Sequence, residues 1–198
     1  MALFSFMAPS LAGTNGFAVR LTSADGKGSD TLVLPNLWLF VEEGQPATPF
    51  LPPGGFTAVF EGSISGDLRA NYFFKVEELA GSLKLEVNNE AVLDTNIRGA
   101  LSKSVRINKG ANAVRAIFTS AGTGDSSLRV GWTEKGTNVN PIPNALIAHA
   151  RSPELQQAEA TYLGRELFLE NRCAKCHLGK FVSPVPELAM DAPTFFNI

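Results

Sequence analysis

The sequence predicts a mainly β protein, an antiparallel β-sandwich followed by a short α-helical segment. Between residues 16 and 132, apolar and polar residues alternate in one short run after another, which is the pattern of half-buried strands. Turn-forming residues separate these runs, in keeping with the 18 glycines and 12 prolines of the chain. No helical pattern of useful length precedes residue 150. Many short strands with regular turn signals favour a sandwich.

The first part of the predicted sandwich contains short strands and a long loop. Residues 17–21 alternate and predict one half-buried strand, and residues 24–28 predict a turn. The apolar run 31–41 is interrupted by Pro35, which cannot donate to a strand ladder. We therefore expect an edge position there, or two short strands with a bend. Residues 43–55 carry four prolines and predict an extended loop.

The alternation sharpens in the second part. Asn88 and Asn89 predict a tight hairpin, because asparagine tolerates the positive φ that such turns need. Residues 108–110 and the glycine-rich segment 121–125 predict further turns. Strands with one apolar face are predicted over residues 56–60, 72–76, 83–87, 114–118 and 128–132.

Composition and charge exclude several classes of protein. The 198 residues include 17 basic and 19 acidic side chains, a formal net charge of −2, so we expect no nucleic-acid partner. Two cysteines are too few for a disulfide scaffold. No run approaches the roughly 18 apolar residues of a membrane span.

Residues 3–12 are apolar and end in small residues, but no positive n-region precedes them. We interpret residues 1–15 as the remnant of an export signal, with an ordinary first strand as the alternative.

A helix is predicted after a linker over residues 136–143. Ser152 has the character of an N-cap, Pro153 suits the first helical position, and Glu154 places an acidic group in the first turn. The helix should run to about residue 170 or 171. The predicted organisation is therefore a signal remnant over 1–15, a sandwich over 16–149 and a helical domain fragment over 150–198.

The segment after the predicted helix carries the most specific motif. Cys173, Cys176 and His177 form the pattern C-x-x-C-H, which is typical of a c-type haem attachment site. Two thiols at this spacing can form thioethers with the vinyl groups on one edge of a porphyrin. The adjacent imidazole can then ligate the iron on its proximal side. The motif predicts one covalently bound haem c, with His177 as an axial iron ligand.

Other interpretations of the motif are weaker. A zinc site normally needs four cysteine or histidine ligands, and His149 is the only spare imidazole. A thioredoxin-like motif needs a βαβ context, which the flanking residues do not offer. A disulfide between such close cysteines would constrain almost nothing.

The strand region resembles the protective-antigen-type β-sandwich, the PA-fourteen domain. The resemblance covers roughly residues 16–149, and the family occurs on toxins, glycosidases and adhesins. Some members bind sugars through calcium, using a pair of adjacent aspartates just before the strand that matches residues 83–87. This chain has Glu77 and Glu78 there. Calcium prefers a cluster of several oxygen ligands, so we expect no calcium site. The phrases that carry the resemblance are 55–62 (GFTAVFEG), 71–76 (NYFFKV), 82–88 (SLKLEVN), 105–110, Gly131-Trp132 and 141–143.

Residues 164–168 (GRELF), followed by the C-x-x-C-H motif, resemble the start of a class I cytochrome c. That family begins with a helix whose glycine and aromatic residue pack on a later helix. The second iron ligand is usually a methionine several tens of residues downstream. Met190 is the only methionine after His177 and is a weak candidate for this ligand. The resemblance implies that the cytochrome part is truncated.

These patterns lead to one main functional hypothesis and one alternative. The main hypothesis is an exported c-type cytochrome, periplasmic or at the cell surface, that passes electrons to a redox protein partner and uses the sandwich for docking. The alternative is a carbohydrate- or protein-binding sandwich with an incidental or zinc-binding tail. No catalytic constellation is present in the sequence, so we do not expect an enzyme, although a haem domain of a larger oxidoreductase remains compatible with the motif.

Overall fold

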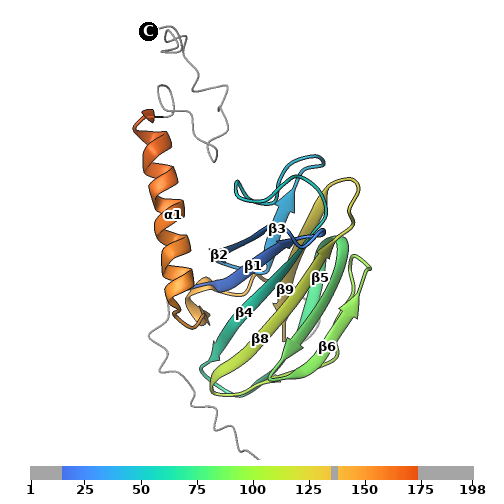
Figure 1. Cartoon of the computed structure of the whole chain (residues 1–198). Coiled ribbons are helices and arrows are strands. Elements are labelled where there is room, and N and C mark those ends of the chain that lie inside the picture. Colours follow the sequence, from blue (N-terminus) through green and yellow to red (C-terminus); the bar gives the residue numbers. More distant parts are fainter. Residues whose placement is uncertain (1–14, 135–137, 174–198) are drawn as a thin grey trace, which may run out of the picture.

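The computed structural model describes residues 15–134 and 138–173 (Figure 1). Within these residues, ten strands form one antiparallel system in the order β2-β1-β4-β8-β5-β9-β3, with β10 beside β4 and with β6 and β7 beside β5. The predicted mainly β fold class is confirmed. The elements are β1 (Phe17–Ser23), β2 (Ser29–Leu34), β3 (Trp38–Val41), β4 (Phe56–Gly66), β5 (Ala70–Val87), β6 (Glu90–Thr95), β7 (Val105–Ile107), β8 (Gly110–Ser120), β9 (Ser126–Thr133), the 3-10 helix η1 (Asn144–Leu146), β10 (Ile147–Ala148) and α1 (Pro153–Glu170).

Strand β5 belongs to both layers of the sandwich. Its residues 73–80 pair with β9, which pairs with β3 in the smaller layer. Its residues 81–87 pair with β8 in the larger layer, beside β4, β1 and β2. Gly81 lies where the partner changes. Its φ is 139°, and an added Cβ would lie 2.3 Å from the carbonyl oxygen of Thr119. Both the dihedral angle and the close approach of backbone require glycine at this position.

The core lies between the two layers and follows the predicted alternation. In β4, Phe56, Ala58 and Phe60 are buried, and the inward residues of β8, β9 and the second half of β5 are buried in the same way. Phe17 packs edge-on against Phe60 with ring centroids 6.5 Å apart. Each such buried ring stabilises the fold by about 1.5–3 kcal/mol relative to an exposed one. The largest fully buried side chains include Phe17, Phe60, Phe74, Phe118, Leu21, Leu37 and Ile64.

Two predicted turns are confirmed in detail. Asn88 and Asn89 have φ values of 51° and 64° and join β5 to β6 as a tight hairpin. The run interrupted by Pro35 forms two strands, and they lie in different layers. Strand β2 pairs with β1, whereas β3 pairs with β9. The bend at this proline therefore carries the chain from one layer to the other.

The sandwich begins and ends at the same place. Asn15 forms an isolated bridge with Ala148, and the Gly16 amide donates to the carbonyl oxygen of Ile147 at 3.2 Å. The His149 ring is 1% exposed, and its Nδ1 lies 2.9 Å from the Gly16 carbonyl oxygen. His149 is thus a buried part of the sandwich.

Helix α1 begins as predicted. Ser152 is the N-cap, and its Oγ accepts a hydrogen bond from the Leu155 amide at 3.1 Å. Leu155 is buried, whereas most of the helix is exposed. The helix stands alongside β2 at one edge of the larger layer (Figure 1). The predicted domain boundaries at residues 15/16 and 149/150 stay predictions.

Candidate functional site

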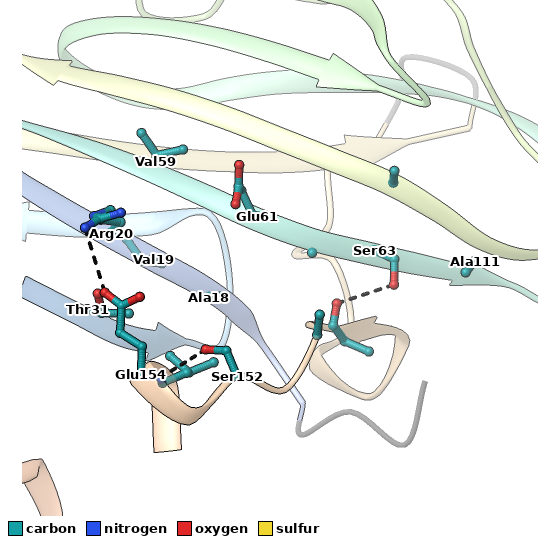
Figure 2. A pocket seen from close by; sticks show the side chains of 15 residues that line it. Ala18, Val19, Arg20, Thr31, Val59, Glu61, Ser63, Ala111, Ser152 and Glu154 are labelled. Carbon is teal, nitrogen blue, oxygen red and sulfur yellow. Dashed lines mark hydrogen bonds and ion pairs between the residues drawn. The ribbon is translucent and has the colours of Figure 1, made fainter. Parts of the chain in front are cut away.

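A groove of about 550 Å³ lies on the outward face of the larger layer (Figure 2). Strands β1, β4 and β8 form its floor, and the segment from Ala148 into the first turn of α1 forms one wall. This volume is within the usual range for a small-molecule site. The lining residues are Ala18, Val19, Arg20, Thr31, Val59, Glu61, Gly62, Ser63, Ala111, Ala113, Ala148, Ala150, Ser152, Glu154 and Leu155.

The strands that form the floor of the groove carry small side chains at their outward positions. Successive side chains of a strand point to opposite faces, so the residues between the buried ones face the groove. On β1 and β8 these residues are Ala18, Ala111 and Ala113. On β4, Val59 occupies the equivalent position. The floor therefore offers a mainly apolar surface that a flat ligand can contact.

The wall is held against β4 by backbone and side-chain contacts. Strand β10 pairs Ile147 with Ile64 and Ala148 with Ser63. The Ser63 hydroxyl also donates to the Ala148 carbonyl oxygen at 3.4 Å. The Ser152 cap then starts α1, so the wall is fixed at both ends.

Two ion pairs form the charged rim. An Arg20 terminal nitrogen lies 3.8 Å from Glu154 Oε1, and the pair bridges β1 to α1. Arg115 Nε lies 3.2 Å from Glu61 Oε1 on the neighbouring strands β8 and β4. Exposed pairs of this kind contribute about 0–1 kcal/mol to stability, because solvent screens them. Their donors and acceptors are therefore accessible to a ligand at little structural cost.

A second cavity, of about 340 Å³, adjoins the groove along α1. Thr31 and Glu154 line both cavities. At its far side, the Tyr162 hydroxyl donates to Asp30 Oδ2, and the Tyr162 ring packs edge-on against Phe50 with centroids 5.4 Å apart. Burial, and then the hydrogen bond with Asp30, raise the pKa of the Tyr162 phenol above its ordinary value. This contact holds α1 against β2.

The acidic pair singled out in the sequence does not form an open cation site. Glu77 and Glu78 lie at a bulge of β5. Glu78 Oε1 is 2.7 Å from Arg98, and Glu77 Oε2 is 3.2 Å from Arg129 Nε. Each carboxylate is therefore balanced by an arginine. Within the part of the chain that the structure describes, no group of three or more histidine, cysteine or acidic residues is arranged to hold a metal ion.

The residues predicted to bind haem are only partly described. Cys173 follows the end of α1, and its Sγ lies 3.9 Å from the Asn171 carbonyl oxygen. Cys176, His177 and Met190 lie outside the described residues. Covalent haem attachment at this motif, and an axial role for His177 or Met190, stay predictions.

Sequence reasoning missed the groove residues Arg20, Glu61 and Glu154. Each occupies a position where a charged side chain on an exposed strand or helix face is ordinary. The pairing of β1 with β4 and the position of α1 bring them together, and neither leaves a local signal in the sequence. The alanines at outward positions of β8 were the one available hint, because a strand of this kind usually carries larger polar residues there.

Comparisons with known proteins place the sandwich among solved structures. No family model matches the sequence, and no curated protein is detectably similar to it. The PA14 domain of the MpAFP antifreeze protein superposes with a TM-score of 0.58 at 15% identity, covering 77% of this chain and 99% of that domain. A PA14 sugar-binding domain from an RTX adhesin has a TM-score of 0.56 at 13% identity, with 69% and 99% covered. These likenesses agree with the β-sandwich fold.

A third similar structure is an anti-sigma factor domain-containing protein from Clostridium clariflavum, with a TM-score of 0.57 at 14% identity. The match covers 70% of this chain and 48% of that protein. A second anti-sigma factor domain-containing protein matches over 70% of this chain and 49% of its own length. The chain thus spans about half the length of these two structures.

The interpretation of residues 150–198 as the start of a cytochrome c domain is wrong. The main functional hypothesis, electron transfer by an exported c-type cytochrome, is therefore wrong as well. The similar structures are PA14 sandwiches and anti-sigma factor domain-containing proteins. Within residues 15–134 and 138–173 there is one α-helix, and it packs against β2. Gly164, which motivated the resemblance, has no neighbouring atom within 4 Å of its Cβ position among those residues. A glycine and an aromatic residue four positions apart fit many helices. The predicted redox partner has no support.

Proposed function

We propose that the sandwich is a carbohydrate-binding module of an exported or cell-surface protein, and that it binds sugar in the groove beside α1. The observation that carries this proposal is the combination of an apolar floor with a rim of paired charges and hydroxyl groups. The naming of one similar structure as the sugar-binding domain of an adhesin supports it. Within the described residues, no helix is long and apolar enough to cross a membrane.

The chemistry of the groove suits a sugar ring. A pyranose has an apolar face of C–H groups and an edge of hydroxyl groups. The face can lie on Ala18, Ala113 and Val59, while the hydroxyls donate to Glu61 and accept from Arg20. Hydrogen bonds to charged groups are stronger than neutral ones, so these two residues would fix the orientation of the ring.

The proposal concerns binding without catalysis and without calcium. The carboxylates of Glu61 and Glu154 each lie in an ion pair with an arginine and are exposed to solvent. The arginine partners of Glu77 and Glu78 leave no anionic cluster for calcium at the position used by some PA14-type domains.

A glycan array probed with the full chain tests the proposal. We expect binding to at least one sugar, equal with calcium and with EDTA. Ala113→Phe should fill the groove and weaken that binding at least tenfold, because the ring would occupy the floor. Glu61→Gln should weaken it about tenfold through loss of a charge-assisted hydrogen bond.

Glu90→Gln is the matched control. The Glu90 carboxylate also pairs with an exposed cation, Lys103, and it lies outside the groove. This variant should bind like the unmodified chain. Failure of the array to show any sugar, or binding that is unaffected by Ala113→Phe, would contradict the proposal.

A further inference from the structure

Two aromatic side chains are exposed on the outward face of the smaller layer. Trp38 is 56% exposed and Phe40 is 63% exposed, although most aromatic residues of the sandwich are buried in its core. Both lie on β3, the last strand of the layer, and they are two positions apart, so they point the same way. Exposed aromatic groups gathered in one place are typical of interaction surfaces.

The orientation of Trp38 is fixed by its neighbours. Arg129 on β9 is its register partner, and the guanidinium carbon lies 4.7 Å from the centre of the Trp38 ring. Glu77 holds the same guanidinium through Arg129 Nε at 3.2 Å. An aromatic group held in this way loses little conformational entropy when a ligand stacks on it.

Polar groups of balanced charge continue the surface across the layer. Glu78 pairs in register with Arg129, and its carboxylate accepts from Arg98 at 2.7 Å. Ser127 lies opposite Phe40. We call the surface made by Trp38, Phe40, Ser127, Arg129, Glu77 and Glu78 the aromatic face. With Arg98 included, its formal charges cancel.

We propose that the aromatic face is a second carbohydrate site, one that takes an uncharged polysaccharide chain. Side chains two positions apart on a strand are about 6.5–7 Å apart, so neighbouring sugar rings can stack on Trp38 and Phe40 together. Arg129 Nε pairs with Glu77, and the guanidinium lies beside the Trp38 ring, so its N–H donors are placed next to the stacking position of a sugar ring.

The balanced charge of the aromatic face favours an uncharged polysaccharide over charged ligands. A polyanionic glycan or a nucleic acid would need an excess of cations, and an acidic or basic peptide would meet an equal number of repelling and attracting charges. An uncharged polyhydroxyl chain meets aromatic rings, donors and acceptors without that penalty. The groove lies on the larger layer and the aromatic face on the smaller one, so the two sites share no lining residue. A chain with both would bind a glycan surface with avidity.

Tryptophan fluorescence gives a direct test, because the protein has two tryptophans and only Trp38 is well exposed. The full chain is titrated with soluble xylan, mannan, laminarin and hydroxyethylcellulose, and with polygalacturonate as the anionic probe. Acrylamide quenching is measured at each step. We expect at least one uncharged glycan to protect Trp38 several-fold from the quencher, and polygalacturonate to give no protection.

Variants assign the site. Trp38→Ala should weaken binding of that glycan at least tenfold and Phe40→Ala several-fold, whereas Leu68→Ala, which removes an exposed apolar side chain elsewhere, should leave it unchanged. Loss of binding in Ala113→Phe but not in Trp38→Ala would overturn this second site and leave the groove standing. The reverse result would remove the groove and support the aromatic face. Self-association that Trp38→Ala abolishes, without any glycan protection, would assign the face to a second copy of the chain and overturn the proposal.

Discussion

The outward faces of the two layers differ in what covers them and in the residues they carry. On the larger layer, the segment from Ala148 into the first turn of α1 forms a wall beside the strands, and the neighbouring outward positions hold alanines. On the smaller layer, no described segment is paired with the free side of β3, and the outward positions hold Trp38 and Phe40. The comparison shows that one alternating pattern serves two surface designs. Small residues leave a groove beside the segment that follows Ala148, and large ones form a flat surface that no described segment covers.

The largest expected effect separates buried aromatic residues from exposed ones. Phe118→Ala should lower the free energy of unfolding by about 3–5 kcal/mol, because it leaves a cavity between the layers. Phe40→Ala should change it by less than about 0.5 kcal/mol, since that ring already lies in water. Urea denaturation of both variants measures the difference. Equal losses would mean that the aromatic face belongs to the core.

The next effect concerns Gly81, where the shared strand passes from one layer to the other. Gly81→Ala should cost about 3 kcal/mol or more, because the added Cβ would meet the Thr119 carbonyl oxygen at 2.3 Å and the φ of 139° strains any other residue. Gly124→Ala is the control. Its φ is 72° and its Cβ position is open, so only the dihedral strain of about 1–2 kcal/mol applies. Thermal unfolding that ranks the two the other way would contradict the role of the close approach.

A smaller effect tests how helix α1 is held against the sandwich. Tyr162→Phe removes the hydrogen bond to Asp30 but keeps the ring against Phe50, and we expect a loss of about 1–2 kcal/mol in helix docking. Tryptic cleavage after Arg165 should become faster in proportion. Leu163→Ala, on an exposed side of the same helix, should leave the cleavage rate unchanged.

High pH should weaken the same contact. The pKa of Tyr162 is raised by burial and then by the Asp30 hydrogen bond. The contribution to stability is therefore complete below the ordinary tyrosine pKa of about 10 and is lost as the pH rises above it. Burial, and then the hydrogen bond to Glu134, also raise the pKa of Tyr72, the other tyrosine of the chain. Tyrosinate absorbance near 295 nm should thus appear at a higher pH in the folded protein than in urea. Coincident titrations would refute this prediction.

The smallest effect lies at the rim of the groove. Arg20→Ala breaks the 3.8 Å pair with Glu154, and both side chains are more than half exposed. We expect a loss of no more than about 0.5 kcal/mol, which 0.5 M salt should abolish. The same variant should weaken sugar binding in the groove but not on the aromatic face. A stability loss above about 2 kcal/mol would show that the pair is structural.

Much of the fold was predictable because its signals are local. The alternation in residues 83–87 and 114–118 fixed which side chains face the core, and Ser152 with Pro153 marked the start of α1. The layer of each strand was not predictable, since β2 and β3 come from one apolar run and Pro35 shows only that it bends. The docking of Tyr162 on Asp30 joins residues 132 positions apart and has no local signal.

The candidate sites were predicted less well, for a related reason. The C-x-x-C-H motif is a five-residue pattern that indicates only local covalent chemistry, and it carries no information about the surfaces of the sandwich. The groove depends on register, because Ala18 faces Glu61 and Ser63 faces Ala113 only once β4 lies between β1 and β8. Trp38 and Phe40 lie in an apolar run whose pattern would equally predict buried core residues.

The bridge between Asn15 and Ala148 bears on how such a module can be shared among proteins. Because the chain enters and leaves the sandwich at neighbouring residues, the two ends of this unit lie side by side. It could be spliced into a surface loop of an unrelated host without forcing the two flanks apart. A graft of that unit would carry the aromatic face into the new host, whereas the groove would also need the segment from Ala148 into the first turn of α1, which forms its wall.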